Sequence, residues 1–290
     1  MEKLTKKLKD NIEGVKAVLS AEDILVYGFL TGDGTECAIV YTDGMVDKAL
    51  LGDLAARPLS KLTPENKEKG FTPEEVKQTL LFPELKEETQ LQNIFAEVLD
   101  GNSLLLVDGL ETGLIVGAKL LPVRTVMEPP TDIAVKGPRE GFIEDIKTNM
   151  ALLRKRLKTP DLKFELQKAG KRSQTNIAIC YLDGICDEKV KKEVAARIGE
   201  IDIDCIPDSS YVAAFIAPRK HSIFREVGTT EKPDILAAKM AEGRVGILVD
   251  GSPIALTVPF ILTEDFQSSE DYFVSPFMAT IFRAIRFLAI

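Results

Sequence analysis

The sequence lacks most of the residues that enzyme chemistry requires. It has no tryptophan and a single histidine, His221, which stands in a polar stretch. Ser-His-Asp catalysis needs an imidazole beside its nucleophile, and a general base needs a group that orients it. Nothing around His221 in the sequence points to either role, and we interpret it as a surface residue. We therefore predict that the protein is not an enzyme.

Metal chemistry is equally poorly represented. The four cysteines form no C-x-x-C pair, whereas a structural zinc site takes four nitrogen or sulfur ligands at close spacing. We predict no metal and no cofactor. Cys37 and Cys180 lie inside apolar runs, where a free cysteine behaves as a small hydrophobic residue. We expect reduced thiols, the usual state in a cytoplasmic setting.

The charge balance disfavours nucleic acid as a partner. The net charge is −8, so no basic surplus is present to neutralise phosphates. Aromatic residues make up only 7% of the chain, which leaves few platforms for base stacking. No glycine-rich phosphate-binding motif occurs. No run reaches the ~20 apolar residues of a membrane span, and the amphipathic start of the chain lacks the core of a secretory signal.

What the chain does contain is an internal repeat. The segment from Ala38 to Asp47 returns 140 positions later as Ala178 to Asp187, with Tyr-x-Asp-Gly at its centre. A second pair recurs at nearly the same offset, where 100–109 matches 242–251 and both end in Val-Asp-Gly. Apolar residues at spacings of 4, 4, 3 and 4 also mark a helix at the start of each copy. The repeat predicts two related domains.

Each copy predicts a helix, two strands, two or three helices and two further strands. We therefore expect an α/β protein with two tandem related domains, each a mixed four-stranded sheet packed with helices. The second and third strands of each copy are continuous apolar runs, which favours central positions with both faces covered. The expected boundaries are a first domain at 1–121, a linker with paired prolines at 122–141, a second domain at 142–262 and a tail at 263–290.

The four Asp-Gly pairs allow two interpretations. Carboxylates gathered at strand ends are typical of catalytic or metal sites. We prefer the alternative, in which glycine supplies a positive φ and aspartate caps a turn. The same dipeptide at matched places in both copies favours a shared architectural cause.

Two segments are unusually basic or apolar. Arg154, Lys155, Arg156 and Lys158 follow one another near a helix end; they either complement the helix dipole in solvent or contact an anionic lipid or partner. The tail from Phe277 to Ile290 is apolar with two arginines. It is either an amphipathic docking helix or, as we prefer, the start of a first membrane helix, whose arginines would hold this side in the cytoplasm.

One block of the sequence resembles a known family. Residues 128–142, Glu-Pro-Pro-Thr-Asp-Ile-Ala-Val-Lys-Gly-Pro-Arg-Glu-Gly-Phe, resemble the signature of the GerA family, the A subunits of spore germinant receptors. Further matches are Tyr-Leu-Asp-Gly-Ile at 181–185, Asp-Ser-Ser-Tyr at 208–211, Thr-Glu-Lys-Pro-Asp at 230–234 and Val-Asp-Gly-Ser-Pro at 249–253. The resemblance is strong from Glu128 onward and loose before it, and the 60–89 insertion has no recognised counterpart.

The resemblance implies a receptor subunit of the spore inner membrane, with this region on the cytoplasmic side. It implies assembly with B and C subunits, possible self-association, and membrane attachment through a C-terminal region beyond this chain. In this interpretation Arg139, Glu140 and Asn149 position one domain against the other or against a neighbour. Arg154 and Arg156 face a partner or lipid headgroups.

A rival hypothesis belongs to a different class. Two α/β lobes joined by a linker form a cleft, and clefts between lobes commonly bind ligands. A small nutrient molecule would then bind near Asp183, Glu231, Arg244 and Asp250. The sequence offers no aromatic-lined pocket in support of this alternative.

Overall fold

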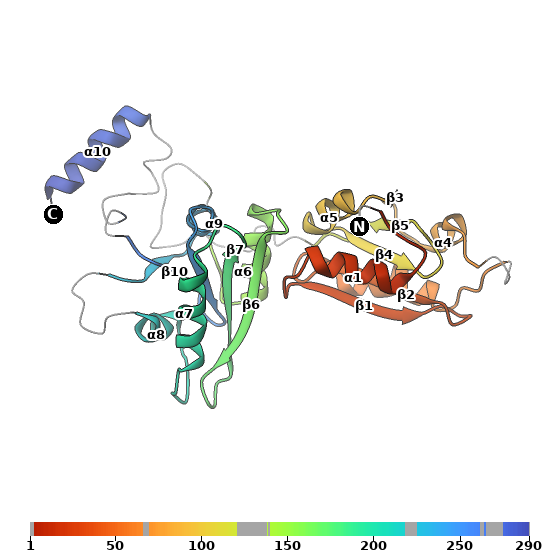
Figure 1. Cartoon of the computed structure of the whole chain (residues 1–290), viewed down its shortest axis with the longest axis horizontal. Helices are drawn as coiled ribbons and strands as arrows, with labels where there is room; N and C mark the ends of the chain where they lie inside the picture. The colour runs from red at the N-terminus through yellow and green to blue at the C-terminus, as the bar shows by residue number, and fades with distance from the viewer. Residues whose placement is uncertain are drawn as a thin grey trace. The chain divides into compact units, whose positions relative to one another are not determined.

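The chain forms two compact units, which we call lobes (Figure 1). The computed structural model describes residues 3–65, 70–120, 138, 140–217, 225–261, 264 and 275–289. The first lobe comprises residues 1–122 with 158–160, and the second comprises 123–157 with 161–290. The boundaries predicted for the linker fall largely on residues outside the described ranges.

The first lobe is built on one five-stranded sheet with the strand order β1-β2-β4-β5-β3. Every registered strand pair in it is antiparallel. Its elements are α1 (Leu8–Val18), β1 (Ile24–Leu30), β2 (Glu36–Thr42), α2 (Lys48–Leu51), the π-helical turn η1 (Gly52–Ala56), α3 (Arg57–Leu59), α4 (Pro73–Thr79), β3 (Leu85–Glu88), α5 (Leu91–Leu99), β4 (Ser103–Val107) and β5 (Gly113–Val116).

The second lobe repeats this plan with the strand order β6-β7-β9-β10-β8, again with antiparallel pairs. Its elements are α6 (Ile146–Arg156), β6 (Leu162–Ala169), β7 (Thr175–Leu182), α7 (Glu188–Gly199), α8 (Ser209–Ile216), β8 (Gly228–Thr230), α9 (Pro233–Ala241), β9 (Val245–Val249), β10 (Ala255–Val258) and α10 (Pro276–Ala289).

The prediction of two related α/β lobes is confirmed, but the details of the sheets were wrong. Each sheet has five strands rather than four, and its described pairs are antiparallel rather than mixed. The missed strands are β3 and β8, which are only four and three residues long and pair with β5 and β10 at a sheet edge. Such short, polar edge strands carry no apolar alternation that a sequence pattern can detect.

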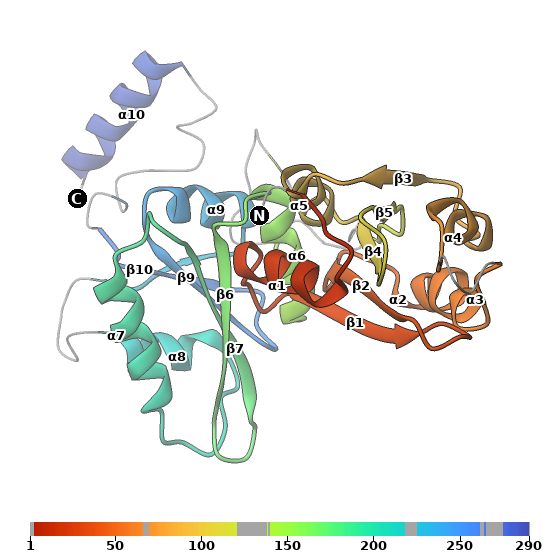
Figure 2. The ribbon, with the colours of Figure 1, turned by 45° about the vertical axis from the view of Figure 1, so that its right-hand side comes forward.

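Helices cover both faces of each sheet, so each lobe has two hydrophobic cores. In the first lobe α1 and α5 pack with one face, and α2 to α4 with the other (Figure 2). In the second lobe α6 and α9 pack with one face, and α7 and α8 with the other. The central strands β4 and β9 are buried at every residue. Burial of these apolar central strands, at about 25 cal/mol per Å² of apolar surface, contributes to the stability of each lobe.

A buried asparagine fixes the chain just before α1 and α6. Asn149 accepts a hydrogen bond from the Ile143 N–H at 2.9 Å and donates to the Ile143 carbonyl at 2.5 Å. In the first lobe Asn11 makes the same two bonds with Thr5, at 2.8 and 2.7 Å. Both side chains are almost fully buried. The role predicted for Asn149 as a contact between domains stays untested, but its amide is occupied within its own lobe.

The pairs Asp43-Gly44 and Asp183-Gly184 are turns capped by their aspartates, as predicted. Gly44 and Gly184 adopt positive φ values of 78° and 74°, a conformation that glycine adopts without strain. The side chains of Asp43 and Asp183 accept from the glycine N–H at 3.0 and 3.1 Å. The aspartates therefore serve the turn geometry in both copies.

The last described helix, α10, carries exposed apolar side chains. Phe277 is 74% exposed and Leu288 is 84% exposed. Among the described residues, no helix combines the length and apolar character needed to cross a bilayer. The two interpretations of the tail, a docking helix or the beginning of a membrane segment, both stay predictions.

Candidate functional site

The structure separates the residues that the sequence singled out. Arg139 and His221 lie outside the described residues. Glu140, Arg156 and Asn149 lie at or near α6, while Asp183 lies after β7 on the exposed surface. Glu231 and Arg244 lie at opposite ends of α9. They form no single cluster within the second lobe, and each makes contacts of its own.

Glu140 holds two cations of α6. Its carboxylate lies 2.8 Å from the Lys155 ammonium and 2.8 Å from the Arg156 guanidinium. Burial alone would raise the pKa of Glu140, but the hydrogen bonds from Lys155 and Arg156 outweigh it and lower the pKa below its ordinary value. This cluster joins the end of the predicted linker to the C-terminal turn of α6. It is partly exposed, and a partner role for Arg156 stays a prediction.

The prediction that Arg154 faces a partner or lipid is wrong. Arg154 is fully buried. Its guanidinium donates to the Leu162 carbonyl at 3.1 Å and lies 5.2 Å from the centre of the Phe164 ring. The physical reason is helical geometry: Arg154 follows Met150 by four residues and continues the buried stripe of α6. It ties α6 to β6 instead of forming a surface contact.

Two residues of the predicted ligand set have structural roles inside the second lobe. The Asp250 carboxylate accepts from the Ile146 N–H at 3.4 Å and from the Asn176 amide at 3.2 Å, which anchors the start of α6. Asp108 does the same for Leu8 in the first lobe, at 2.9 Å. The Glu231 carbonyl accepts from the Phe142 N–H at 2.7 Å. Binding of a nutrient by these residues stays a prediction.

Arg244 belongs to a buried charge cluster that we regard as the candidate functional site. Its guanidinium forms an ion pair with Glu264 without the alignment of a hydrogen bond. Lys239 reaches the same carboxylate, with 2.7 Å between Nζ and Oε2. The side chains of Arg244 and Glu264 are each only 10% exposed. A second carboxylate, that of Glu242, contacts the Arg244 guanidinium at 3.2 Å from the solvent side.

Glu264 stands between the last strand, β10, and the last described helix, α10. Its N–H donates to the Ile261 carbonyl at 2.8 Å, and its carboxylate accepts from the Ile261 N–H at 2.8 Å. Lys239 comes from α9 and Arg244 from the turn between α9 and β9. Together the two cations, which we call the cationic clamp, hold Glu264, which follows β10 in the chain.

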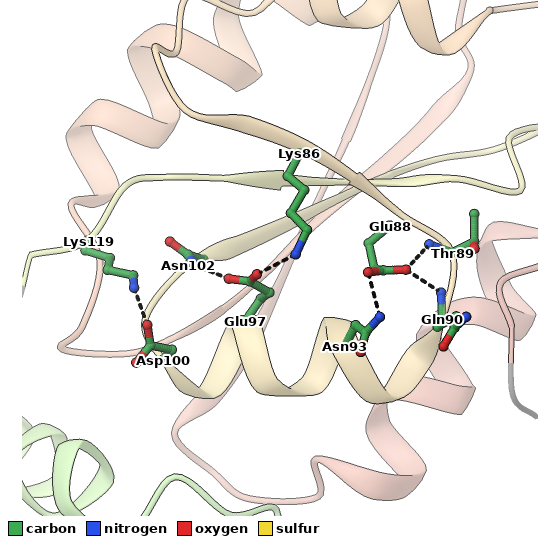
Figure 3. A network of polar contacts seen from close by, with 9 residues as sticks. All are labelled: Lys86, Glu88, Thr89, Gln90, Asn93, Glu97, Asp100, Asn102 and Lys119. Atoms are coloured by element: carbon green, nitrogen blue, oxygen red, sulfur yellow. Dashed lines mark hydrogen bonds and ion pairs between the residues drawn. The ribbon is translucent and has the colours of Figure 1, made fainter.

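The corresponding place in the first lobe has the opposite charge. The two cations of the clamp correspond in the repeat to Glu97 and Asn102. Glu97 accepts from the Lys86 ammonium at 3.0 Å and from the Asn102 amide at 2.5 Å (Figure 3). Lys86 lies on β3 of the same sheet. In the first lobe the residue at this position is therefore paired with side chains of the same lobe.

Further hydrogen bonds and ion pairs within the first lobe involve residues at the two ends of α5. Glu88 accepts from the N–H groups of Thr89 and Gln90 at 2.9 and 3.0 Å at the start of α5 (Figure 3). Asp100 at its end pairs with Lys119. Hydrogen bonds, first from the Gln90 N–H, lower the pKa of Glu88 despite some burial. Comparison of the two lobes thus marks the cationic clamp as a feature that the second lobe alone has among the described residues.

A hydroxyl network also joins α8 to the β9–β10 turn. The Ser252 hydroxyl donates to Asp208 at 2.5 Å and lies 3.0 Å from the Ser209 hydroxyl. Asp208 also caps α8 by accepting from the Ser210 N–H at 2.9 Å. Burial would raise the pKa of Asp208, but the bonds from Ser252 and Ser210 lower it from 3.8 to about 2.

Substitution of Ser252 by alanine should therefore give a pH-dependent loss of stability. A folded-state pKa below the unfolded value stabilises the lobe above about pH 4, and the stabilisation is lost as the pH falls toward 2. We expect Ser252→Ala to lower the free energy of unfolding by about 1 kcal/mol at neutral pH, after allowance for solvent screening. Urea titrations from about pH 6 to pH 3 should show the difference from the natural protein narrowing. A difference that is constant with pH would contradict the role of Asp208.

Sequence reasoning named Arg244 but missed Lys239 and Glu264. The signal was present in the repeat, because Glu97 and Asn102 change to Lys239 and Arg244 at matched positions. A reversal of charge between copies indicates that one copy has acquired a different partner. No described group of His, Cys, Asp and Glu is arranged to hold a metal ion.

The fold and its repeats match a known family. A family model described as Bacillus/Clostridium GerA spore germination protein matches residues 8–290. This chain belongs to the GerA family. The resemblance seen from Glu128 onward in the sequence is thereby confirmed, and it extends through the first lobe as well.

Named relatives of this GerA chain include proteins of Bacillus subtilis (strain 168). Spore germination protein KA is 35% identical over 283 residues, which cover 97% of this chain and 52% of the relative. The uncharacterized membrane protein YfkQ is also 35% identical, over 97% of this chain and 55% of its own length. This GerA chain therefore spans about half the length of the curated relatives it matches.

A solved structure covers nearly the same region. The N-terminal domain of the A subunit of the Bacillus megaterium spore germinant receptor GerK3 matches with a TM-score of 0.67 and 30% sequence identity. The match covers 89% of this chain and 98% of that chain. This GerA chain thus corresponds to the N-terminal domain of an A subunit. Subunits of this family are receptors rather than enzymes, which confirms the prediction of no enzyme.

Proposed function

We propose that this chain is the cytoplasmic N-terminal region of a germinant receptor A subunit in the spore inner membrane. It assembles with the B and C subunits and transmits a nutrient signal toward the membrane part. The match to the GerK3 domain and the membrane relatives support this placement. The observation that carries the transmitting role is the cationic clamp on Glu264.

The clamp is suited to transmit movement because it is buried and charged. Removing one partner of a buried ion pair leaves an uncompensated charge, which typically costs about 3–5 kcal/mol. Lys239 and Arg244 therefore resist separation from Glu264. A displacement of α9 or of its turn to β9 would move Glu264 with it. Rigid-body shifts of packed helices are a common way to carry a signal.

Substitution of Glu264 by glutamine in the full-length subunit tests this role. We expect the amide hydrogens of Phe260, Ile261 and residue 264 to exchange at least about tenfold faster, since Lys239 and Arg244 no longer hold a carboxylate there. Spores carrying the variant should germinate several-fold more slowly in response to nutrient, with normal amounts of A, B and C subunits. Measurements are hydrogen exchange of the purified chain and a spore germination assay.

Glu242→Gln is the matched control. Glu242 also pairs with Arg244, but its side chain is 56% exposed. This variant should exchange and germinate as the natural protein does. If Glu264→Gln speeds exchange at Phe260 and Ile261 while germination stays normal, the transmitting role is wrong. If β9 loses its protection as well, the clamp only stabilises the lobe, which also overturns the proposal.

A further inference from the structure

The outer edge of β1 is the one long, unprotected sheet edge within the described residues. The edges of the two sheets are β1, β3, β6 and β8. Proteins guard such edges with short strands or charged side chains. β3 and β8 are short, and β6 carries Lys163, Glu165 and Lys168. β1 is seven residues long, and its sequence Ile-Leu-Val-Tyr-Gly-Phe-Leu contains neither charge nor proline.

The backbone of β1 directs alternate residues outward. The Thr31 N–H donates to the Thr35 carbonyl at 3.0 Å, in the same register as the β1–β2 pairing. Hydrogen-bonded and non-hydrogen-bonded pairs alternate along an antiparallel ladder. The backbone N–H and C=O groups of Val26, Gly28 and Leu30 therefore point away from β2. Glycine at position 28 permits a close backbone approach.

A hollow lies beside β1 on each face of the sheet. The first, of about 310 Å³, is lined by residues that include Tyr27, Tyr41 and Leu51. The second, of about 360 Å³, is lined by residues that include Ile12 and Leu30. Side chains of a strand alternate between the two faces. A strand added to β1 would thus place successive side chains in the two hollows, the arrangement by which strand addition gains specificity.

The second lobe fills the place that corresponds to the first hollow. There the Tyr181 hydroxyl donates to Glu165 at 2.6 Å, and the Lys191 ammonium lies 4.4 Å from the centre of the Tyr181 ring. In the strand register, Tyr27 of the first lobe takes the position of Glu165 in the second. Leu51 takes the position of Lys191, because each lies four residues after the aspartate that caps its helix. The first lobe lacks the tyrosine–glutamate hydrogen bond at this place, and Lys48, which also lines the first hollow, has its ammonium 5.8 Å from the centre of the Tyr41 ring.

Charge decides which occupant fits the edge. Exposed acids flank β1, with Glu22 before it and Asp33 and Glu36 after it. An antiparallel pairing of β1 with a second copy would bring Glu22 of one chain beside Asp33 of the other, and both chains carry a net charge of −8. Like charges across paired strands are destabilising. An occupant with basic residues at its ends complements the same acids.

We propose that the outer edge of β1 binds an extended segment of another polypeptide as an added strand. The segment is apolar at successive positions and carries lysine or arginine at its ends. This inference rests on the proposed role of the chain in receptor assembly. It names the surface of the first lobe that takes part, whereas the cationic clamp lies in the second lobe.

Binding of a synthetic apolar peptide with lysines at both ends tests the proposal with the purified chain. We expect saturable binding, with slowed amide exchange at Val26, Gly28 and Leu30. Val26→Pro removes one outward N–H without touching the β2 ladder and should weaken binding at least about tenfold. Tyr27→Lys places a charge on an exposed position of the edge and should weaken it similarly. Lys168→Pro, the matched edge proline on β6, should leave binding unchanged.

Several results would overturn the proposal. One is equal binding by the natural protein and both β1 variants, or no binding at all. Equal affinity for a peptide with glutamates at its ends would remove the charge argument. A dimer of the chain that Val26→Pro abolishes would make the occupant a second copy. The Glu264→Gln result stands apart from these, so failure at β1 leaves the transmitting role of the clamp in place.

Discussion

Replacement of Arg154 by glutamate should prevent the second lobe from folding. The guanidinium is fully buried, lies over the Phe164 ring and donates to the Leu162 carbonyl. A glutamate would bury an anion against a carbonyl oxygen and the negative face of a ring. Burial of an unpaired charge costs several kcal/mol, a large part of the 5–15 kcal/mol by which domains of this kind are stable.

A milder variant of Arg154 allows the loss in free energy of unfolding to be measured. Arg154→Met keeps the apolar volume but loses the cation–π contact and leaves the Leu162 carbonyl without this donor. We expect a loss of about 2–4 kcal/mol, read from urea unfolding and from amide exchange in β6 and β7. Arg156→Glu is the control, because Arg156 makes a partly exposed ion pair with Glu140 that is worth about 1 kcal/mol or less. Similar small losses in all three variants would show that the buried guanidinium contributes little.

Replacement of Asn149 by leucine should be the next most damaging change. The variant leaves the N–H and the carbonyl of Ile143 without the Asn149 amide, in a partly buried place. Each such group costs about 1–3 kcal/mol, and we expect about 2–4 kcal/mol in total from the second lobe. Asn11→Leu should do the same to the first lobe through Thr5.

The paired design makes this prediction specific. Hydrogen exchange should lose protection in β7 and β9 for Asn149→Leu, and in β2 and β4 for Asn11→Leu. Asn93→Leu serves as the control, because Asn93 is exposed and contacts Glu88 at the surface. It should change stability by no more than about 0.5 kcal/mol. Uniform loss of protection in both lobes from either core variant would refute independent cores.

Much of the architecture was predictable because the repeat imposes the same turn chemistry twice. Asp43-Gly44 and Asp183-Gly184 marked the end of the second strand in each copy, and the apolar runs beside them identified the central strands. β3 and β8 were not predicted, because their sequences, Leu-Lys-Glu-Glu and Gly-Thr-Thr, form strands only by pairing with a neighbouring strand. Their pairing is a tertiary effect that local pattern does not contain.

The candidate site was predictable only in part. Arg154, Lys155 and Arg156 were treated as one basic surface, although successive helical residues point about 100° apart. One of the three therefore enters the core while the other two meet Glu140. Arg244 was identified through its motif, but its partner Glu264 stands twenty residues away across β9 and β10. Spacing in the sequence does not reveal a contact that the sheet creates.

Each sheet takes its strands from one continuous half of the chain, and this has a consequence for how the protein is made. β5 completes the first sheet at Val116, whereas the second needs β10, which ends at Val258. At about 5–20 residues per second of synthesis, the ribosome finishes the first set of strands about 7–30 s before the second. Strands of similar sequence are thereby kept apart in time during translation. Refolding from denaturant offers no such delay, so exchange of strands between the two copies is expected to be more frequent there than during synthesis.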